Sequence, residues 1–204
     1  CLHAIFGGDW RIEPRLDEYE RLLMENSVVR ARMVDVAPIS VDDAVAWGLT
    51  GPMLRAAGLP WAWRKQRPYS HYDWFDFDVP VGTTGDCYDR AAVHVEEMRQ
   101  SLRIMRQVAD ALPDGPYKAY HPLATPPMKE PHTMHHIESL ITHFLGVSWG
   151  PVVPPGEASV YTEGTKGQYS YSAISDGGNA AYRVKIRTAS FPHLQVLPHL
   201  CIGR

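Results

Sequence analysis

Cysteine is scarce in this chain of 204 residues, and the three that occur, Cys1, Cys87 and Cys201, lie far apart. No two of them form a C-x-x-C pair, which excludes a zinc ribbon, and three are too few for a disulfide framework. Scattered cysteines of this kind are typical of a reducing compartment. We therefore expect reduced thiols and no metal bound by the chain.

Long hydrophobic runs are also missing. Pro, Gly or a charged residue interrupts every apolar stretch within about ten residues, well short of the roughly 20 needed to span a bilayer. The sequence begins with Cys1 rather than Met and stops in mid-pattern at Leu200 to Arg204. We expect a soluble, internal stretch of a longer protein with both termini truncated, and we see no signal peptide.

Charge of one sign is not in excess. Lys and Arg number 20 against 23 Asp and Glu, a formal net charge of −3, so the basic excess usual in nucleic-acid-binding domains is lacking. The composition, 45% apolar and 21% charged, is that of an ordinary globular protein. The length suits a single domain or a large part of one, and we expect residues 1–204 to form a partial single domain. The patterns described below predict a helical part at about 13–146, with the long loop 59–85, and a β-meander at 158–187.

The clearest predicted element is a helix from about Cys87 to Leu112. Asp86 is the expected N-cap, and the Pro-Asp-Gly-Pro sequence at 113–116 ends the helix. Apolar residues recur at helical spacing along it, which predicts one continuous apolar stripe. Its arginines, among them Arg99, Arg103 and Arg106, predict either a solvated surface or a face for an acidic partner.

Shorter helices are predicted nearby. Pro14 opens one that stops at Asn26, Ser40 and Asp43 begin a second that ends at Gly48, and a third covers 52–58. Residues 59–85 read as a long aromatic loop, which is unusual inside a domain and points to a functional or packing role. A further helix is expected at about 133–146.

In the last part of the sequence, the spacing of apolar residues changes from helical to alternating. Residues 158–163, 168–175 and 181–187 alternate in polarity and are separated by Gly-rich turns, which predicts a three-stranded antiparallel meander. Helices followed by strands predict an α+β fold that is mainly helical.

Several patterns could carry chemistry, but each has a simpler explanation. His132, His135, His136 and His143 surround one helix, yet the Glu of the H-E-x-x-H motif is missing, so surface histidines are favoured over a metal site. Cys87 follows Asp86, whose negative charge disfavours a thiolate nucleophile. The loop 82–86 before the long helix lacks the Gly-Lys-Ser/Thr of a phosphate-binding loop, so a turn that orients the helix is favoured.

A set of sequence motifs lies at 48–55, 64–69, 77–90, 96–104, 164–167, 175–178, 182–187 and 191–194. In order and spacing, from about Leu16 to Arg204, these motifs resemble the hydrogenase-like D subunit of NADH:quinone oxidoreductase, respiratory complex I. Residues 121–145 are similar to the bacterial branch in which the C and D subunits can be fused, whereas the first dozen residues fit poorly.

The resemblance implies a fold like the large subunit of nickel–iron hydrogenase, without its metal. It implies an oxidoreductase subunit that helps to couple electron transfer from NADH, through iron–sulfur clusters, to quinone with proton translocation. The terminal cluster is expected in the neighbouring subunit, with the C subunit as another partner, and quinone as the substrate. The expected location is the cytoplasmic side of the bacterial inner membrane, peripheral to it, or the matrix side of the inner membrane if the protein is mitochondrial.

The family's quinone-headgroup residues lie outside this stretch, so no catalytic residue is assigned. Lys185, Arg187 and His193 are the candidates for bordering the cluster or the quinone cavity, with packing of the meander as the favoured alternative. Two other functions remain open: a nickel–iron hydrogenase large subunit, which needs C-x-x-C pairs for its metals, and a non-catalytic scaffold or assembly protein.

Overall fold

The computed structural model describes residues 12–115 and 135–202. These residues form two compact units. The described part of the first unit comprises residues 12–112, 161–170 and 187–202, and that of the second comprises 135–160 and 171–186 together with residues 113–115. The first two strands of the sheet contribute residues to both units, and a single partial domain stays a prediction.

The first unit begins with helices that differ in part from those predicted. The helical segment that begins near Pro14 ends at Met24, close to the predicted stop at Asn26. The Asn26 side chain also accepts a hydrogen bond from the Val28 amide and caps a further helix that was not predicted. Ser40 caps the next helix through the Asp43 amide, as predicted. The helices are α2 (Ile12–Tyr19), the π-helical turn η1 (Glu20–Met24), α3 (Ser27–Met33), α4 (Val41–Ala46) and α5 (Pro52–Ala56).

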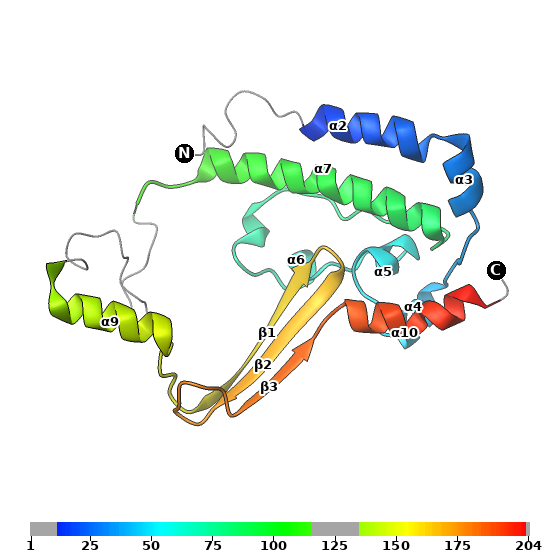
Figure 1. Cartoon of the computed structure of the whole chain (residues 1–204). Helices are drawn as coiled ribbons and strands as arrows, with labels where there is room; N and C mark the ends of the chain where they lie inside the picture. The colour runs from blue at the N-terminus through cyan, green and yellow to red at the C-terminus, as the bar shows by residue number, and fades with distance from the viewer. Residues whose placement is uncertain (1–11, 116–134, 203–204) are drawn as a thin grey trace. The chain divides into compact units, whose positions relative to one another are not determined.

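The long helix α7 (Cys87–Ala111) is confirmed, and Figure 1 shows α2 running beside it. The Asp86 carboxylate accepts bonds from the amides of Asp89 and Asp35, both at 2.8 Å, so the cap also fixes the segment before α4. The predicted stripe is buried only in part. Leu102 is buried, but Met98 and Met105 are exposed, since no described segment covers that part of the helix.

The arginine row of α7 finds acidic partners within the chain. Three of these arginines form ion pairs with carboxylates of α2, η1 or the segment before α7, which favours the predicted acidic face, although the partner is intramolecular. The pairs are Arg99 with Asp17 and Glu20, Arg103 with Asp76 and Asp78, and Arg106 with Glu13.

Residues 59–85 are not a structureless loop. They contain the short helix α6 (Trp63–Gln66) and the 3-10 turn η2 (Tyr72–Trp74). Aromatic contacts replace regular structure: Tyr72 meets Tyr69 edge-on at 5.1 Å and Phe77 at 6.1 Å, and Phe77 is fully buried.

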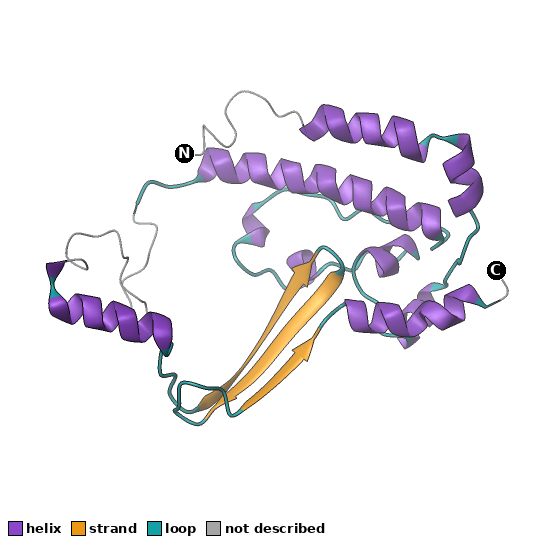
Figure 2. Cartoon of the chain, in the orientation of Figure 1, coloured by secondary structure: helices purple, strands orange, loops and turns teal. Residues whose placement is uncertain are grey.

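The predicted meander is confirmed as a three-stranded antiparallel sheet in the order β1-β2-β3, which Figure 2 shows in orange. The strands are β1 (Gly156–Gly164), β2 (Gly167–Ser175) and β3 (Arg183–Arg187). Across the hairpin, Ser159 Oγ lies 2.9 Å from Ser172 Oγ.

A helix that the sequence pattern did not predict, α10 (Ser190–Cys201), completes the first unit. Its Val196 and Leu200 are buried in the core formed with α4, α5 and the segments around them. Pro192 lies in its first turn, where the missing N–H costs little, while Pro198 lies inside the helix. The other core residues are Ala37, Ile39, Ala44, Leu49, Leu54 and Ala57.

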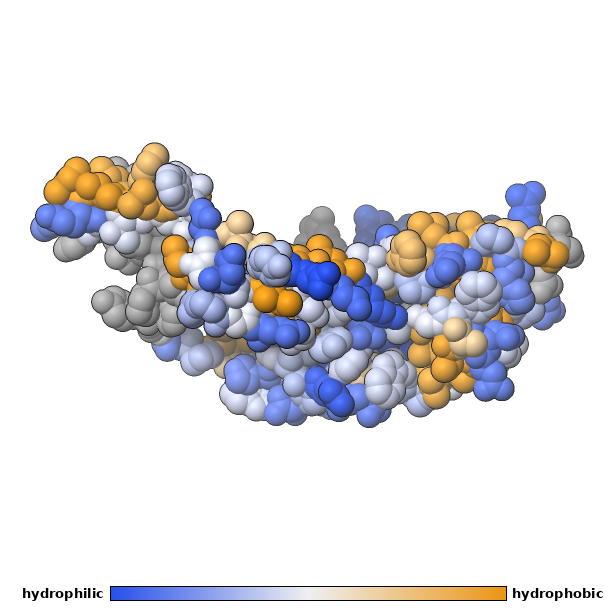
Figure 3. Space-filling view, turned by 90° about the horizontal axis from the view of Figure 1, so that it is seen from below, coloured by the Kyte–Doolittle hydropathy of each residue, from blue (hydrophilic) through white to orange (hydrophobic). Residues whose placement is uncertain are grey.

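The second unit holds the helix α9 (Ile137–Ser148), close to the predicted bounds of 133–146. The predicted start at Thr133 and the connector 121–131 lie outside the described residues. One side of α9 is strongly apolar and exposed, with Phe144 and Val147 each about two-thirds accessible. Figure 3 shows orange, hydrophobic surface over this helix.

Candidate functional site

The segment from Gly48 to Gly51, called here the 48–51 turn, connects α4 to α5. Gly48 adopts a positive φ of 68° and ends α4 in a Schellman motif, in which the amides of Gly48 and Leu49 bond the carbonyls of Val45 and Ala44. Gly51 also has a positive φ, 69°, and is the N-cap of α5. The turn thus places the buried Thr50 between two glycines of positive φ.

The tip of the β1–β2 hairpin contacts this turn backbone to backbone. A Cβ on Gly51 would lie 2.5 Å from the Cα of Gly167, so only two glycines permit the observed approach. The Gln168 amide donates to Thr50 Oγ1 at 3.1 Å. The hairpin tip is thus fixed against the start of α5.

Two of the three predicted site residues meet at the same turn. Arg187 Nη2 donates to the Gly48 carbonyl at 3.0 Å, and His193 Nε2 lies 3.2 Å from the Thr50 carbonyl. Because a carbonyl only accepts, this contact selects the Nε2–H tautomer. Burial lowers the pKa of His193, and the nearby Arg187 adds to this, so the neutral ring is favoured. Lys185 is exposed on β3 and belongs to the second unit.

Beneath the hairpin tip lies a buried ion cluster of Arg55, Arg64, Glu97 and Glu163. Arg55 is only 1% exposed, and its Nη1 donates to Glu163 Oε1 at 2.6 Å and to the Trp61 carbonyl at 2.9 Å. Its Nη2 is ion-paired with Glu97 on α7. One guanidinium therefore connects α5, α7, the 59–85 segment and β1.

Tyr69 and Trp63 enclose this cluster. The Glu163 amide donates to Tyr69 Oη at 2.8 Å, and Trp63 stacks on Tyr161 with ring centroids 5.4 Å apart. Burial raises the pKa of Tyr69 despite its backbone hydrogen bond to Glu163, so the phenol stays protonated at neutral pH. The aromatic residues thus shield the charges from water, which strengthens their interactions.

The loop before α7 is occupied by a carboxylate of the chain itself. The amides of Thr83 and Thr84 each donate to Asp89 Oδ2 at 2.7 Å, and the Thr84 hydroxyl adds a bond of 2.9 Å. Burial by itself raises the pKa of Asp89, but these hydrogen bonds outweigh it and the pKa is lowered. The Asp89 carboxylate thus accepts the hydrogen bonds that a bound phosphate would need. This supports the prediction that the loop is a turn that orients the helix rather than a phosphate-binding loop.

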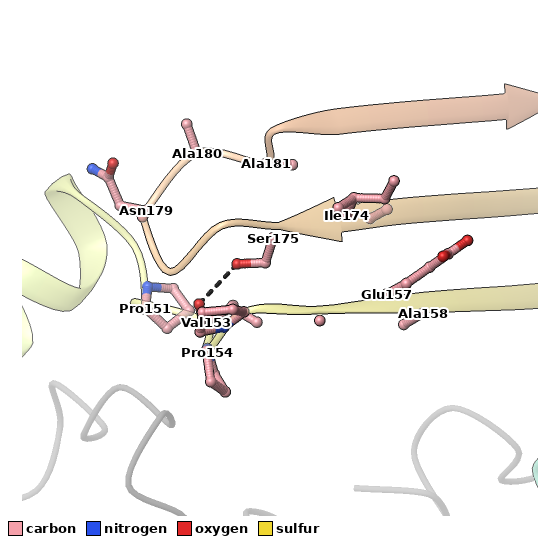
Figure 4. Close-up of a pocket in the computed structure, with 14 residues that line it drawn as sticks. Pro151, Val153, Pro154, Glu157, Ala158, Ile174, Ser175, Asn179, Ala180 and Ala181 are labelled. Atoms are coloured by element: carbon pink, nitrogen blue, oxygen red, sulfur yellow. Dashed lines mark hydrogen bonds between the residues drawn. The ribbon is translucent and has the colours of Figure 1, made fainter.

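Pockets occur in both units. In the second unit, a mainly apolar pocket of about 500 Å³ lies between residues 151–158, the end of β2 and the turn 178–181, with Ser175 Oγ bonded to the Val153 carbonyl (Figure 4). In the first unit, a pocket of about 540 Å³ is lined by Cys87, Arg90, His193 and Cys201 with apolar neighbours. Arg90 Nη2 lies 3.3 Å from Cys87 Sγ.

Metal ligation was one possibility for the histidines. Among residues 12–115 and 135–202, no group of three or more His, Cys, Asp or Glu is arranged to hold a metal ion. His132 lies outside these residues. Within the same ranges, no helix combines the length and the apolar character that a membrane crossing requires.

Sequence reasoning missed the ion cluster. Glu97 belongs to the charged row of α7 and Glu163 to the end of a strand, while Arg55 is separated from Glu163 by 108 positions. The one local signal is Arg55 itself, a charged residue within the otherwise uncharged segment from Gly48 to Gly58.

Comparison with known proteins gives the family. The chain is 59% identical over 189 residues to the NADH-quinone oxidoreductase C/D subunit of Nitrosospira multiformis, a match that covers 93% of this chain and 31% of the relative. It is 57% identical to the protein of the same name from Acidiphilium cryptum, over 93% of this chain and 32% of the relative. The chain therefore spans about a third of the length of these curated relatives. The family model for the 49 Kd subunit of the respiratory-chain NADH dehydrogenase matches residues 9–204, and the chain belongs to that family.

Proposed function

We propose that the chain is part of a C/D-type subunit of NADH:quinone oxidoreductase, and that the whole protein helps to couple electron transfer from NADH to quinone with proton translocation. The observation that carries this proposal is the identity of 52 to 59% to proteins named as C/D subunits of NADH-quinone oxidoreductase over more than nine-tenths of the chain. Identity this high over nearly the full chain supports a shared role.

The finer fold proposed is that of the nickel–iron hydrogenase large subunit without its metal. The mainly helical first unit and the β1-β2-β3 sheet are compatible with it. The family match to the NADH dehydrogenase subunit favours this function over that of a metal-bearing hydrogenase. The iron–sulfur cluster that delivers electrons is then held by a neighbouring subunit, and this chain supplies protein surface rather than cluster ligands.

The proposed partners are the subunit that carries the terminal cluster and the C subunit, the latter supported by relatives in which C and D are one polypeptide. We place the protein at the cytoplasmic side of the inner membrane, peripheral to it. A pull-down with full-length protein, which in a C/D-type subunit already includes the C subunit, should recover the subunit that carries the terminal cluster and retain NADH:quinone turnover. A scaffold without catalytic effect would recover partners yet leave turnover unchanged when the protein is removed.

The main test is gene deletion in a bacterium that encodes this chain. Membranes of the deletion strain should lose NADH:quinone reductase activity and regain it on complementation with the full-length gene. Normal turnover without the gene would contradict the proposal, and so would nickel bound through cysteines of the full-length protein.

Lys185, Arg187 and His193 stay proposed neighbours of the cluster or quinone cavity. Arg187 and His193 have structural contacts with the 48–51 turn, so their loss would disturb assembly as well as any electron-transfer role. Lys185→Met is the cleaner test because Lys185 is exposed. A changed KM for quinone in Lys185→Met, with no change in the matched Arg183→Met on the same strand, would support the proposal. Identical kinetics in both variants would contradict it for Lys185.

A further inference from the structure

The pocket of the first unit has the size and composition of a small-molecule site. It measures about 540 Å³, and all of the residues that line it belong to that unit. Ligand pockets are typically about 300–1,000 Å³ and mainly apolar, with a few polar groups that fix the orientation of the ligand. Here the polar part includes the guanidinium of Arg90 on α7. The apolar lining residues are Val36, Ala37, Met53, Leu197 and Leu200.

The Arg90 guanidinium is held in place by backbone carbonyls. Its Nη1 donates to the Gly85 carbonyl at 2.6 Å, and its Nη2 donates to the Ala37 carbonyl at 3.0 Å. Ala37 has a φ of 50°, a left-handed conformation that is unfavourable for a residue with a Cβ. Backbone strain of this kind persists where the surrounding structure fixes it, often beside a ligand. The cation is therefore positioned before a ligand arrives, which lowers the entropic cost of binding.

The charge of Arg90 is not balanced by a carboxylate of the described chain. Within residues 12–115 and 135–202, its hydrogen bonds go to the two carbonyls and the Cys87 sulfur, and it forms no ion pair. Asp86 and Asp89 are near in sequence, but both accept hydrogen bonds from backbone amides instead. The described residues that line the pocket include no acid. An anionic group is therefore attracted to this pocket, whereas a cationic group is repelled.

We propose that this pocket binds an amphiphile with one carboxylate and a single apolar chain, with the carboxylate against Arg90 and the chain against Leu197 and Leu200 of α10. Binding is non-covalent, and no bond, proton or electron is transferred. Arginine suits this role because its planar guanidinium presents several N–H donors to a carboxylate at once. A phospholipid offers a similar combination of anionic head and apolar chain, and the test separates the two sources.

The test is differential labelling of the two cysteines that line the pocket, Cys87 and Cys201, in the full-length protein in its native assembly. Cys87 is half-buried and Cys201 is exposed, so both thiols can report on occupancy of the pocket. N-ethylmaleimide is added with rising concentrations of sodium decanoate, kept below those at which micelles form, and labelled peptides are quantified by mass spectrometry. We expect decanoate to slow the labelling of both thiols in a saturable manner. No labelling in the absence of decanoate would show that the pocket is closed in the assembly, and would overturn the proposal.

Three further probes test the chemical class of the ligand. Decan-1-ol should need a roughly 10- to 100-fold higher concentration for the same protection, because hydrogen bonds between two charged groups are the stronger ones. Decyltrimethylammonium should give no protection. Equal protection by decanoate, decan-1-ol and decyltrimethylammonium would refute recognition of an anion. Protection by dioctanoyl phosphatidylglycerol without protection by decanoate would assign the pocket to a phospholipid and also overturn the proposal.

A matched pair of variants tests the location. Leu197 lines the pocket, whereas Leu194 on the same helix lies outside it and is 68% exposed. Leu197→Trp should fill the pocket and remove the effect of decanoate, measured as the ratio of labelling rates with and without it. Leu194→Trp should keep that ratio unchanged. Protection that survives in Leu197→Trp, or that is lost equally in both variants, would show that decanoate does not act at this pocket.

The role of Arg90 is tested with Arg90→Gln. Decanoate should then protect no better than decan-1-ol, and continued protection by decan-1-ol would show that the pocket itself is intact. An undiminished preference for decanoate in Arg90→Gln would overturn the assignment of the carboxylate partner. Should this variant fail to assemble, the comparison of decanoate with decan-1-ol in the unmodified protein still decides. The readout is labelling rather than turnover, so a protein that fails to reduce quinone would overturn the proposed function and leave this result standing, and the reverse also holds.

Discussion

Replacing Gly51 by Ala should release the hairpin tip from the 48–51 turn. The new Cβ would lie 2.5 Å from the Cα and 2.7 Å from the amide nitrogen of Gly167, and backbone atoms cannot swing away as a flexible side chain can. Gly51 also has φ 69° and ψ −145°, a conformation that is nearly restricted to glycine. The substitution thus combines strain at its own position with a clash against the hairpin.

The magnitude follows from these two effects. Backbone strain of this kind costs about 1–3 kcal/mol, and loss of the Gln168 to Thr50 hydrogen bond costs about 0.5–1.5 kcal/mol. The free energy of opening the hairpin tip should therefore fall by roughly 2–4 kcal/mol. Since about 1.4 kcal/mol corresponds to a factor of ten, amide exchange at the tip should accelerate by roughly 30- to 1000-fold.

Hydrogen exchange followed by mass spectrometry on the full-length protein measures this directly, in peptides that cover residues 164–170. Gly48→Ala is the matched control, because Gly48 has nearly the same φ, 68°, but no atom lies within 4 Å of the Cβ position. It should weaken the end of α4 by about 1 kcal/mol and leave the hairpin tip protected. Equal exchange at the tip in both variants would show that steric contact with Gly167 does not hold the hairpin, and would refute the reasoning.

Three further predictions concern stability. Arg55→Met should lower the free energy of unfolding by about 3–5 kcal/mol, since it removes the cation that two buried carboxylates share, whereas Arg55→Lys should lose less; equal denaturation midpoints for Met and Lys would contradict this. Asp86→Ala should cost about 1–2 kcal/mol in chemical denaturation, through the lost N-cap and the lost bond to the Asp35 amide, and Asp86→Asn should recover part of it. The contribution of neutral His193 to the free energy of unfolding is present above its ordinary pKa of 6.5 and is lost as pH falls through its lowered pKa in the folded protein. His193→Gln should therefore flatten that part of the curve of unfolding free energy against pH. An unchanged slope would speak against a buried neutral ring.

The elements that were predicted correctly are those with local signals. Asp86 and Asp89 before an apolar period define the start of α7, and Ser40 with Asp43 defines that of α4. The strands follow from alternation between Gly-containing turns. Each of these signals acts within a few residues, so the sequence alone expresses it.

The elements that were missed depend on contacts distant in sequence. Pro192 and Pro198 are typical of turns, yet α10 forms because Val196 and Leu200 complete a core that other segments supply. The helix α3 was also missed: Asn26 was predicted only as a stop, yet it follows the end of one helical segment at Met24 and also caps the next helix. Helix propensity is a weak prior that tertiary packing overrides in such cases.

The candidate site was predictable only in part. Arg187 and His193 were named from the sequence, and the structure brings both to the 48–51 turn, where their side chains form hydrogen bonds with backbone carbonyls. Arg55, Glu97 and Glu163 were not named, because each has an ordinary local context and becomes exceptional only when the other two are adjacent.

The position of Glu163 gives the cluster a second consequence, for the register of the sheet. Tyr161 and Glu163 are two residues apart on β1, and both face the 59–69 segment, the first stacked on Trp63 and the second bonded to Arg55. A slip of one residue would turn both side chains to the opposite face and place Thr162 against the guanidinium. Apolar contacts tolerate such a slip far better than a buried cation that loses its carboxylate. The ion cluster therefore selects one register of the hairpin, and with it the position at which Gly167 meets Gly51.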